Sequence, residues 1–331
     1  MKAALLQRLL CPRTFLPLRL EHPANSETFE AKLISADGSC CYPIRNGIPR
    51  FVPESNYADN FGMQWNYFAK TQLDSHSGLP ISAERFWKAT GWSSIDMRNK
   101  WVLDVGCGSG RFAEIALSSG AQVVALDYSS AVDACSANLK HHPNLHVVQG
   151  DVFSLPFVPG AFDFVYSLGV LQHTPDVARA FAALPPMLVE GGYLCTDFYW
   201  KRFQTMIHIK YLLRPLTTRI EQQKLFSYLE MAVPLMLPIS QALGRVPLIG
   251  KALQRFIPVA DYSLTYHLTK QQLREWALLD TFDWLAPRYD HPQTQKAVKQ
   301  LFLKAGFTAI EIFHAGHLVG RSVKEYSGFS Q

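Results

Sequence analysis

Short apolar runs alternate with helical patterns between residues 101 and 199, and this alternation constrains the fold more than any other feature of the chain. The runs are rich in residues that favour strands. They occupy residues 101–106, 121–127, 145–151, 162–169 and 191–200. Parallel strands need crossover helices, and such helices cover a sheet on both faces. The pattern therefore predicts an α/β domain with a mostly parallel sheet.

Helices are predicted between these runs, and the same kind of pattern returns near the C-terminus. Apolar residues at helical spacing occupy about 110–120, 130–139 and 176–188, and later 294–307 ahead of two strands within 308–322. We divide the chain into an N-terminal module (1–56), a helical lid or linker (57–100), the α/β core (101–199), an inserted helical cap (200–293) and a segment that completes the core (294–331).

A glycine-rich loop follows the first strand of the core. It reads Asp104-Val105-Gly106-Cys107-Gly108-Ser109-Gly110-Arg111. Glycines let the backbone turn sharply and let a ligand approach the amide groups. The dinucleotide fingerprint requires a third glycine where Arg111 stands, and a phosphate-binding P-loop requires a G-K-[ST] sequence that is absent. The loop suits a cofactor with an amino-acid moiety and a nucleoside but no pyrophosphate.

Acidic residues end the next two strands. Asp127 follows Gly110 by 17 residues, and a carboxylate at this edge of a sheet can accept hydrogen bonds from both hydroxyls of a ribose. Asp151 ends the third strand and is followed by apolar Val152. This pair could bind the amino group of an adenine and cover its ring. The carboxyl ends of parallel strands lie at one edge of the sheet, so we expect these groups to meet there.

Four motifs in order, VLDVGCGSGRF, VVALDYS, VVQGDVFSLPF and FDFVYSLGVLQHTPD, resemble those of class I S-adenosylmethionine-dependent methyltransferases, and most of all the group that includes the ubiquinone and menaquinone C-methylases. The resemblance covers about 101–199 and, more loosely, 294–322. It implies a Rossmann-like seven-stranded sheet whose last strand is antiparallel, with S-adenosyl-L-methionine as cofactor. It also implies cofactor contacts at Gly106, Gly108, Asp127, Asp151, Val152 and Ser167. We add Asp104, Gly110 and Tyr128 to this set. The alternative is a Rossmann-like fold that binds another ligand.

The N-terminal module contains a hairpin signal, because two short strands flank Asn46-Gly47. It resembles the zinc-ribbon-like module that precedes some methyltransferase domains and holds its metal through paired C-x-x-C motifs. Here Cys11 has no partner at position 14, and Cys40 and Cys41 are adjacent. We therefore predict a degenerate module without a bound metal.

Residues 57–74 are rich in aromatics and are interpreted either as a helix packed on the core or as a lid over the cofactor. In the second case Gln64, Trp65 or Gln72 would reach the methionine end of the cofactor. Arg85 could pair with its carboxylate. The predicted cofactor set therefore includes Gln64, Trp65 and Arg85.

The segment 200–260 is basic, with nine Lys or Arg against two Glu, whereas the rest of the chain is slightly acidic. Pro215, Pro234, Pro238 and Pro247 are expected to break it into short helices. The simple interpretation is a cap with a solvated basic face. The alternative is a dock for an amphipathic or anionic acceptor, or for peripheral contact with a membrane surface that carries it. Six cysteines in so long a chain favour a reducing, cytoplasmic compartment.

Methyl transfer from a sulfonium is an in-line displacement, so the protein mainly aligns the acceptor with the methyl group. A base helps when the acceptor must lose a proton. His173 follows the fourth strand and is our candidate catalytic base. The alternative is a hydrogen bond from His173 to backbone or cofactor. Candidate substrate-binding residues from the cap are Tyr262, His267, Asp283, Trp284, Tyr289 and His291, which could equally form a structural hydrogen-bond network.

The leading hypothesis is methylation of a small-molecule or lipid-like acceptor. RNA methylation is a second hypothesis, since some rRNA methyltransferases pair a zinc ribbon with this fold. The incomplete cysteine set argues against nucleic acid, as does the lack of an N/D-P-P-[FY] motif after the fourth strand. A cofactor-binding protein without catalysis is a third.

Overall fold

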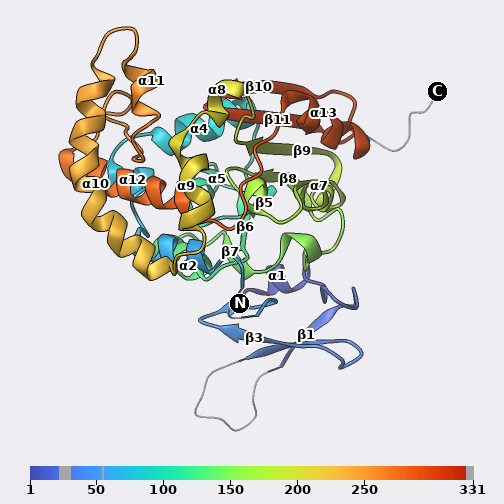
Figure 1. Ribbon diagram of the computed structural model, residues 1–331. Coiled ribbons are helices and arrows are strands. Elements are labelled where there is room, and N and C mark those ends of the chain that lie inside the picture. Colours follow the sequence, from blue (N-terminus) through green and yellow to red (C-terminus); the bar gives the residue numbers. More distant parts are fainter. Residues whose placement is uncertain (22–30, 54–55, 326–331) are drawn as a thin grey trace.

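The computed structural model describes residues 1–21, 31–53 and 56–325, which form two sheets and the helices around them (Figure 1). The larger sheet has seven strands in the order β10-β11-β9-β8-β5-β6-β7. These are β5 (Trp101–Val105), β6 (Gln122–Asp127), β7 (Leu145–Gln149), β8 (Phe162–Ser167), β9 (Leu188–Phe198), β10 (Glu311–Ala315) and β11 (His317–Val323). The predicted α/β class and seven-stranded sheet are confirmed.

Strands β5 to β9 run parallel, and β11 runs antiparallel to β9, as the resemblance implies. The crossover helices are α5 (Arg111–Ser118), α6 (Ala131–Leu139) and α7 (Val177–Ala182). The predicted helix at 176–188 was too long. Pro185 and Pro186 follow α7, and a proline has no N–H for a helical hydrogen bond, so the chain forms a short 3-10 turn there before β9 begins.

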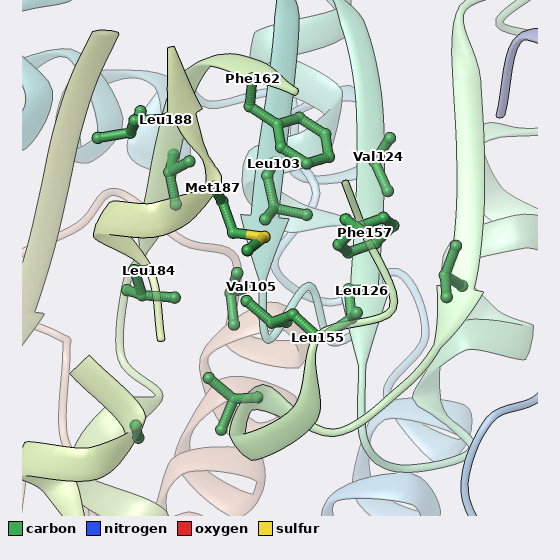
Figure 2. Close-up of a cluster of buried hydrophobic side chains, with 14 of the residues drawn as sticks. Leu103, Val105, Val124, Leu126, Leu155, Phe157, Phe162, Leu184, Met187 and Leu188 are labelled. Atoms are coloured by element: carbon green, nitrogen blue, oxygen red, sulfur yellow. The ribbon is translucent and has the colours of Figure 1, made fainter. Parts of the chain in front are cut away.

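The core lies on both faces of the large sheet. Figure 2 shows part of one side, where Leu103 of β5 and Val124 of β6 point into the same cluster. Their chain neighbours Val102 and Val123 point into a second cluster on the opposite face. Side chains alternate along a strand, so a strand buried on both faces reads as a continuous apolar run. Helix α13 (Gln295–Lys304) packs on the first face through Phe302.

The N-terminal module is a four-stranded antiparallel sheet preceded by α1 (Ala3–Leu6). Its strands are β1 (Leu18–Glu21), β2 (Lys32–Ser35), β3 (Cys41–Arg45) and β4 (Ile48–Pro49). The predicted hairpin is confirmed: β3 pairs with β4, and Asn46 and Gly47 both have positive φ, at 53° and 77°. The guanidinium of Arg50 lies 2.6 Å from a carboxylate oxygen of Asp133 and so links the module to α6. Within the described residues, no group of three or more His, Cys, Asp or Glu side chains is arranged to hold a metal ion.

Between the module and the core lie α2 (Asp59–Tyr67), α3 (Asp74–Ser77) and α4 (Ile81–Thr90). Helix α4 is amphipathic, and Phe86 and Ala89 on its buried face join the core cluster that faces α5. Helix α2 packs beside α6 and buries the polar side chains of Asn60 and Gln64.

The cap consists of α8 (Phe203–Met206), α9 (Ile209–Thr217), α10 (Gln222–Gly244), α11 (Gly250–Gln254) and α12 (Lys270–Leu285). Helices α10 and α12 enclose a separate apolar cluster that includes Val233 and Phe282. The expectation that prolines break this segment was wrong for three of the four. Pro215 lies inside α9, and α10 runs through Pro234 and Pro238 over 23 residues. Both prolines are exposed, so water can bond the carbonyl groups that lose their helical partners. In the described ranges, no helix combines the length and apolar character needed to cross a membrane.

Candidate functional site

A cavity of about 570 Å³ opens at the carboxyl edge of the large sheet. It is bounded by the loops after β5, β6 and β8, by α2 and α4, and by the cap. A volume of this size accommodates a cofactor-sized molecule. The site therefore lies where an open α/β sheet binds its ligands.

The glycine loop forms one wall of this cavity. The backbone N–H of Gly106 donates to the carbonyl of Leu126 at 2.7 Å, which ties the loop to β6. Gly106 and Gly108 line the cavity and have positive φ, at 86° and 51°. A Cβ on Gly106 would lie 2.4 Å from the Val170 side chain, so only glycine lets the loops after β5 and β8 approach this closely.

Asp127 lies at the end of β6 with its carboxylate against the same loop. Its Oδ2 accepts from the N–H of Gly108 at 2.9 Å, and its Oδ1 accepts from the N–H and the hydroxyl of Ser129 at 2.8 and 2.7 Å. Burial raises the pKa of Asp127. A carboxylate has about four acceptor positions, and three hydrogen bonds already reach Asp127. Roughly one position therefore stays available to a ligand hydroxyl, whereas we expected hydrogen bonds from both hydroxyls of a ribose.

The side of the cavity where we expected a purine is aromatic. Tyr128 and Val152 line it as predicted, and Tyr57 lines it as well, with its ring centroid 4.9 Å from that of Tyr128. Asp151 does not line the cavity. Its Oδ1 instead accepts from the N–H of Phe153 at 2.9 Å and caps the 3-10 helix Val152–Ser154.

Two buried polar side chains face the cavity near the glycine loop without a hydrogen-bond partner in the described part of the chain. Both amide atoms of Gln64 are unpartnered, and so is the hydroxyl of Ser109. Both residues line the cavity and are almost fully buried. Leaving such groups unsatisfied costs about 1–3 kcal/mol each, so their presence indicates a polar ligand here. The indole of Trp65 covers Gly108 from the α2 side, where a Cβ on Gly108 would lie 3.2 Å from the ring.

Two arginines line the cavity, and their surroundings differ. The Nη2 of Arg85 lies 2.7 Å from Oδ2 of Asp197. Burial alone would raise the pKa of Asp197, but the charges of Arg85 and His317 outweigh burial and hold it well below its usual range. Arg85 is therefore already paired with a carboxylate.

Arg111 has only neutral partners. Its Nε donates to the hydroxyl of Ser82 at 2.8 Å and its Nη1 donates to Oε1 of Gln72 at 2.7 Å. Burial and the charge of Arg85 lower the pKa of Arg111 to about 10, which leaves it charged at neutral pH. No carboxylate among the described residues forms an ion pair with it. From the sequence we noted Arg111 only because it replaces the third glycine of the dinucleotide fingerprint. Its position in the first turn of α5 could have indicated a binding role, because a cation there is unfavourable against the helix dipole.

His173 lines the cavity from the 3-10 helix Leu171–His173. Its Nδ1 lies 3.0 Å from the backbone oxygen of Tyr289. A carbonyl can only accept, so Nδ1 donates this hydrogen bond, and in the neutral ring Nε2 is the nitrogen without a proton. Within the described residues Nε2 has no hydrogen-bond partner. The ring centroids of Phe61 and Tyr199 lie 5.3 and 5.4 Å from that of His173.

The cap contributes some of the predicted substrate residues and not others. Tyr262, Asp283 and Trp284 line the cavity. His267, Tyr289 and His291 do not, since His267 and His291 are exposed and Tyr289 serves through its backbone oxygen. The cavity also has cap residues that we did not predict as ligands, namely Tyr266, Trp276 and Asp280. Burial raises the pKa of Asp280 to about 7, and its carboxylate accepts from the hydroxyl of Tyr262.

Three further residues of the predicted cofactor set lie outside the cavity lining. Asp104 is buried in β5, and burial raises its pKa to about 8. Gly110 serves packing, because a Cβ there would lie 2.7 Å from the side chain of Leu139 in α6. The hydroxyl of Ser167 donates to the carbonyl of Val105 at 2.9 Å and so joins β8 to β5.

Comparison with known proteins agrees with this geometry. Residues 103–196 match a family model described as a methyltransferase domain. A demethylmenaquinone methyltransferase of Thermobifida fusca is 32% identical over 120 residues, which cover 35% of this chain and 51% of the relative. A trans-aconitate 2-methyltransferase of Deinococcus radiodurans is 41% identical over 98 residues, covering 29% of this chain and 36% of the relative.

Among solved structures, human N-acetylserotonin methyltransferase in complex with SAM aligns at 13% identity with a TM-score of 0.46, over 83% of this chain and 61% of that one. The chain spans about half or less of the length of the two curated relatives described above. Over residues 103–196 the chain is therefore similar to methyltransferase domains.

Proposed function

We propose that this chain transfers the methyl group of S-adenosylmethionine to a small-molecule or lipid-like acceptor held between the cap and the edge of the sheet. One observation carries the proposal. His173, whose buried Nε2 has no hydrogen-bond partner in the described part of the chain, lines the same cavity as the glycine loop, with cap residues such as Trp284 on another wall. A base, a cofactor loop and an acceptor wall thus share one enclosed space.

The cofactor fits the residues present. Gly106 and Gly108 leave room for a ligand against the backbone, Asp127 offers an acceptor position to a ribose hydroxyl, and Tyr57 and Val152 can cover a purine. The unpartnered Gln64 suits the amino-acid end. When bound, the cofactor supplies an electrophilic methyl group on a sulfonium.

Arg111 is the residue that we assign to the cofactor carboxylate. Arg85, which sequence reasoning favoured, is already neutralised by Asp197. Arg111 is charged, partly buried and hydrogen-bonded only to neutral groups. A buried cation is stable when it is paired, and the amino-acid moiety brings the carboxylate that Arg111 lacks.

His173 accepts the proton that the acceptor loses. The backbone oxygen of Tyr289 fixes the ring orientation and the tautomer, so Nε2 is ready as a base. The neighbouring rings of Phe61 and Tyr199 exclude water from it. The walls on the cap side carry the rings of Tyr262, Tyr266, Trp276 and Trp284 together with the carboxyl groups of Asp280 and Asp283, which suits a flat or apolar acceptor that bears a hydrogen-bond donor.

The experiment has two stages. Calorimetry with S-adenosylhomocysteine tests cofactor binding. Incubation with cofactor labelled on its methyl group and a cell extract, followed by partition between water, organic solvent and an RNA fraction, tests transfer. Label in the organic phase or in small molecules supports the proposal. Label in RNA would establish the RNA alternative, and binding without transfer to any fraction would establish a non-catalytic role.

A further inference from the structure

The connection between α10 and α11, together with α11 itself, forms an exposed apolar tip on the cap, which we call the cap tip (residues 245–256). Figure 1 shows it as the loop that projects beyond the top of α10. Every residue from Arg245 to Ile249 is exposed, and Leu248 is exposed over its whole side chain. Phe256, at the end of the tip, is exposed by more than half. A soluble surface rarely gathers apolar side chains in this way without a partner.

Packing and hydrogen bonds hold the cap tip in place, so the exposure of its apolar side chains does not arise from a frayed end. Gly250 packs so closely on α10 that a Cβ there would lie 2.4 Å from the carbonyl of Leu243. The amide of Gln254 donates to the carbonyl of Ser240 and to the carboxylate of Asp261, both at 3.1 Å. Leu248 itself has a φ of +67°, a backbone conformation that disfavours a leucine. The fold thus holds an apolar side chain outward at a position where glycine would relieve the strain.

The charged residues of the cap tip itself are all positive, and the carboxylate of neighbouring Asp261 accepts hydrogen bonds from Ser240 and Gln254. Arg245, Lys251 and Arg255 are exposed, and the sequence has no acidic residue from Met231 to Ala260. An apolar stripe continues down the outer face of α10, where Met231, Leu235 and Ile239 recur every four residues and are each more than half exposed. Apolar side chains within a ring of cations match the boundary between acyl chains and anionic headgroups of a bilayer.

A second copy of the chain fits this surface less well. In a two-fold symmetric contact the same patch faces itself. The three cations of one tip would then meet those of the other with no acid between them, and like charges placed together oppose association.

We propose that the cap tip docks on an anionic lipid surface, with Leu248 and Ile249 inserted among the headgroups and Arg245, Lys251 and Arg255 against lipid phosphates. This proposal does not depend on methyl transfer, because docking needs no turnover. It fits a lipid-like acceptor, which would then reach the cap from the membrane that carries it.

Vesicle co-sedimentation of the full chain tests the proposal. The protein should bind vesicles in which about a third of the lipid is phosphatidylglycerol, and should stay in solution with phosphatidylcholine alone. Leu248→Ser with Ile249→Ser should weaken binding at least about tenfold. Replacing Arg245, Lys251 and Arg255 by Gln should weaken it about a hundredfold, since each cation contributes about fivefold.

Matched controls separate the tip from general effects. Lys296, Lys299 and Lys304 are exposed on or beside α13, and replacing them by Gln removes the same charge elsewhere. Phe15→Ser removes an exposed aromatic from the N-terminal module. Both controls should bind vesicles to within about twofold of the unaltered protein. Affinity for S-adenosylhomocysteine, unchanged in all variants, reports that each one folds.

The outcomes divide clearly. Selective loss of binding in the two tip variants supports the proposal. It is overturned if the unaltered protein ignores anionic vesicles, or if the tip and control variants weaken binding equally. It is also overturned if light scattering detects a dimer that Leu248→Ser with Ile249→Ser abolishes, because a second copy is then the occupant.

Discussion

The Nδ1 atom of His173 lies 3.0 Å from the backbone oxygen of Tyr289, a residue 116 positions further along the chain. This contact joins the loop after β8 to the segment that follows the cap. It determines which nitrogen of the neutral imidazole carries the proton, and Nε2 has no hydrogen-bond partner within the described residues. The position of the segment after the cap and the orientation of the His173 ring are therefore coupled through one hydrogen bond.

His173→Asn and His173→Gln test whether His173 acts as the base. The Asn amide can still donate to the Tyr289 oxygen but places nothing at the position of Nε2. We expect methyl transfer to fall about 10²–10⁴-fold in His173→Asn, with affinity for S-adenosylhomocysteine unchanged. Transfer of labelled methyl into extract and calorimetry measure the two effects. His173→Gln cannot serve as a base either and should be equally slow. Full activity in either variant would show that His173 only supports the structure.

Arg111→Met tests the assignment of the cofactor carboxylate. Loss of a charge-assisted pair of hydrogen bonds should weaken S-adenosylhomocysteine binding about ten- to hundredfold. Binding of 5′-methylthioadenosine, which has no carboxylate, should hardly change. Calorimetry with both ligands gives the comparison. Arg274 lies exposed on α12, so Arg274→Met is the control for a lost arginine. An equal loss for both ligands would indicate that Arg111 acts on the shape of the cavity.

Asp104 should make stability depend on pH. Burial, and after it the charge of Asp127, raises the pKa of Asp104 to about 8, against about 3.9 in an unfolded chain. The folded state thus holds the proton more tightly, so the contribution of Asp104 is fully present below about pH 4 and is lost as pH rises through about 8.

Asp104→Asn removes this dependence. Without ligand, the Tm of the variant should exceed that of the unaltered protein by several degrees at about pH 8.5, and the gap should shrink toward about pH 5. Asp96 is exposed and its pKa is lowered to about 2 by its bond to Arg98, so Asp96→Asn should give no such trend over this range. A gap that does not vary with pH would exclude titration of Asp104 as the cause.

The sequence predicted those parts of the fold that depend on local pattern. Strands β5 to β9 bury both faces, so each reads as an apolar run, and Asn46-Gly47 has the backbone freedom that a tight hairpin requires. The prediction that the prolines of α10 break the helix was wrong, because their effect depends on which side of the helix faces water. That side is set by packing against α12.

The site was predictable where it depends on the loops that follow each strand, and not where it depends on distant partners. Gly106, Asp127 and His173 lie at the cavity because strand order places them there. The pairing of Arg85 with Asp197 spans 112 residues, and nothing in the local sequence of Arg85 reveals it. Unless the pairing of Arg85 with Asp197 is known, nothing favours Arg111 over Arg85 as the residue that binds the carboxylate of a cofactor.

Gly106 and Val170 form a steric pair that a double variant can test. Gly106→Ala introduces a Cβ 2.4 Å from the Val170 methyl groups at a φ of +86°. We expect a loss of about 2–4 kcal/mol in unfolding free energy and weaker S-adenosylhomocysteine binding. Gly78→Ala has a similar φ of +72° with open space around it, so it should cost only about 1 kcal/mol. Adding Val170→Ala to Gly106→Ala should recover the part of the lost unfolding free energy that comes from the steric contact, but not the part that comes from the positive φ. Denaturant unfolding of the unaltered protein, Gly106→Ala, Val170→Ala and the double variant gives the cycle, and strictly additive costs would contradict the steric contact.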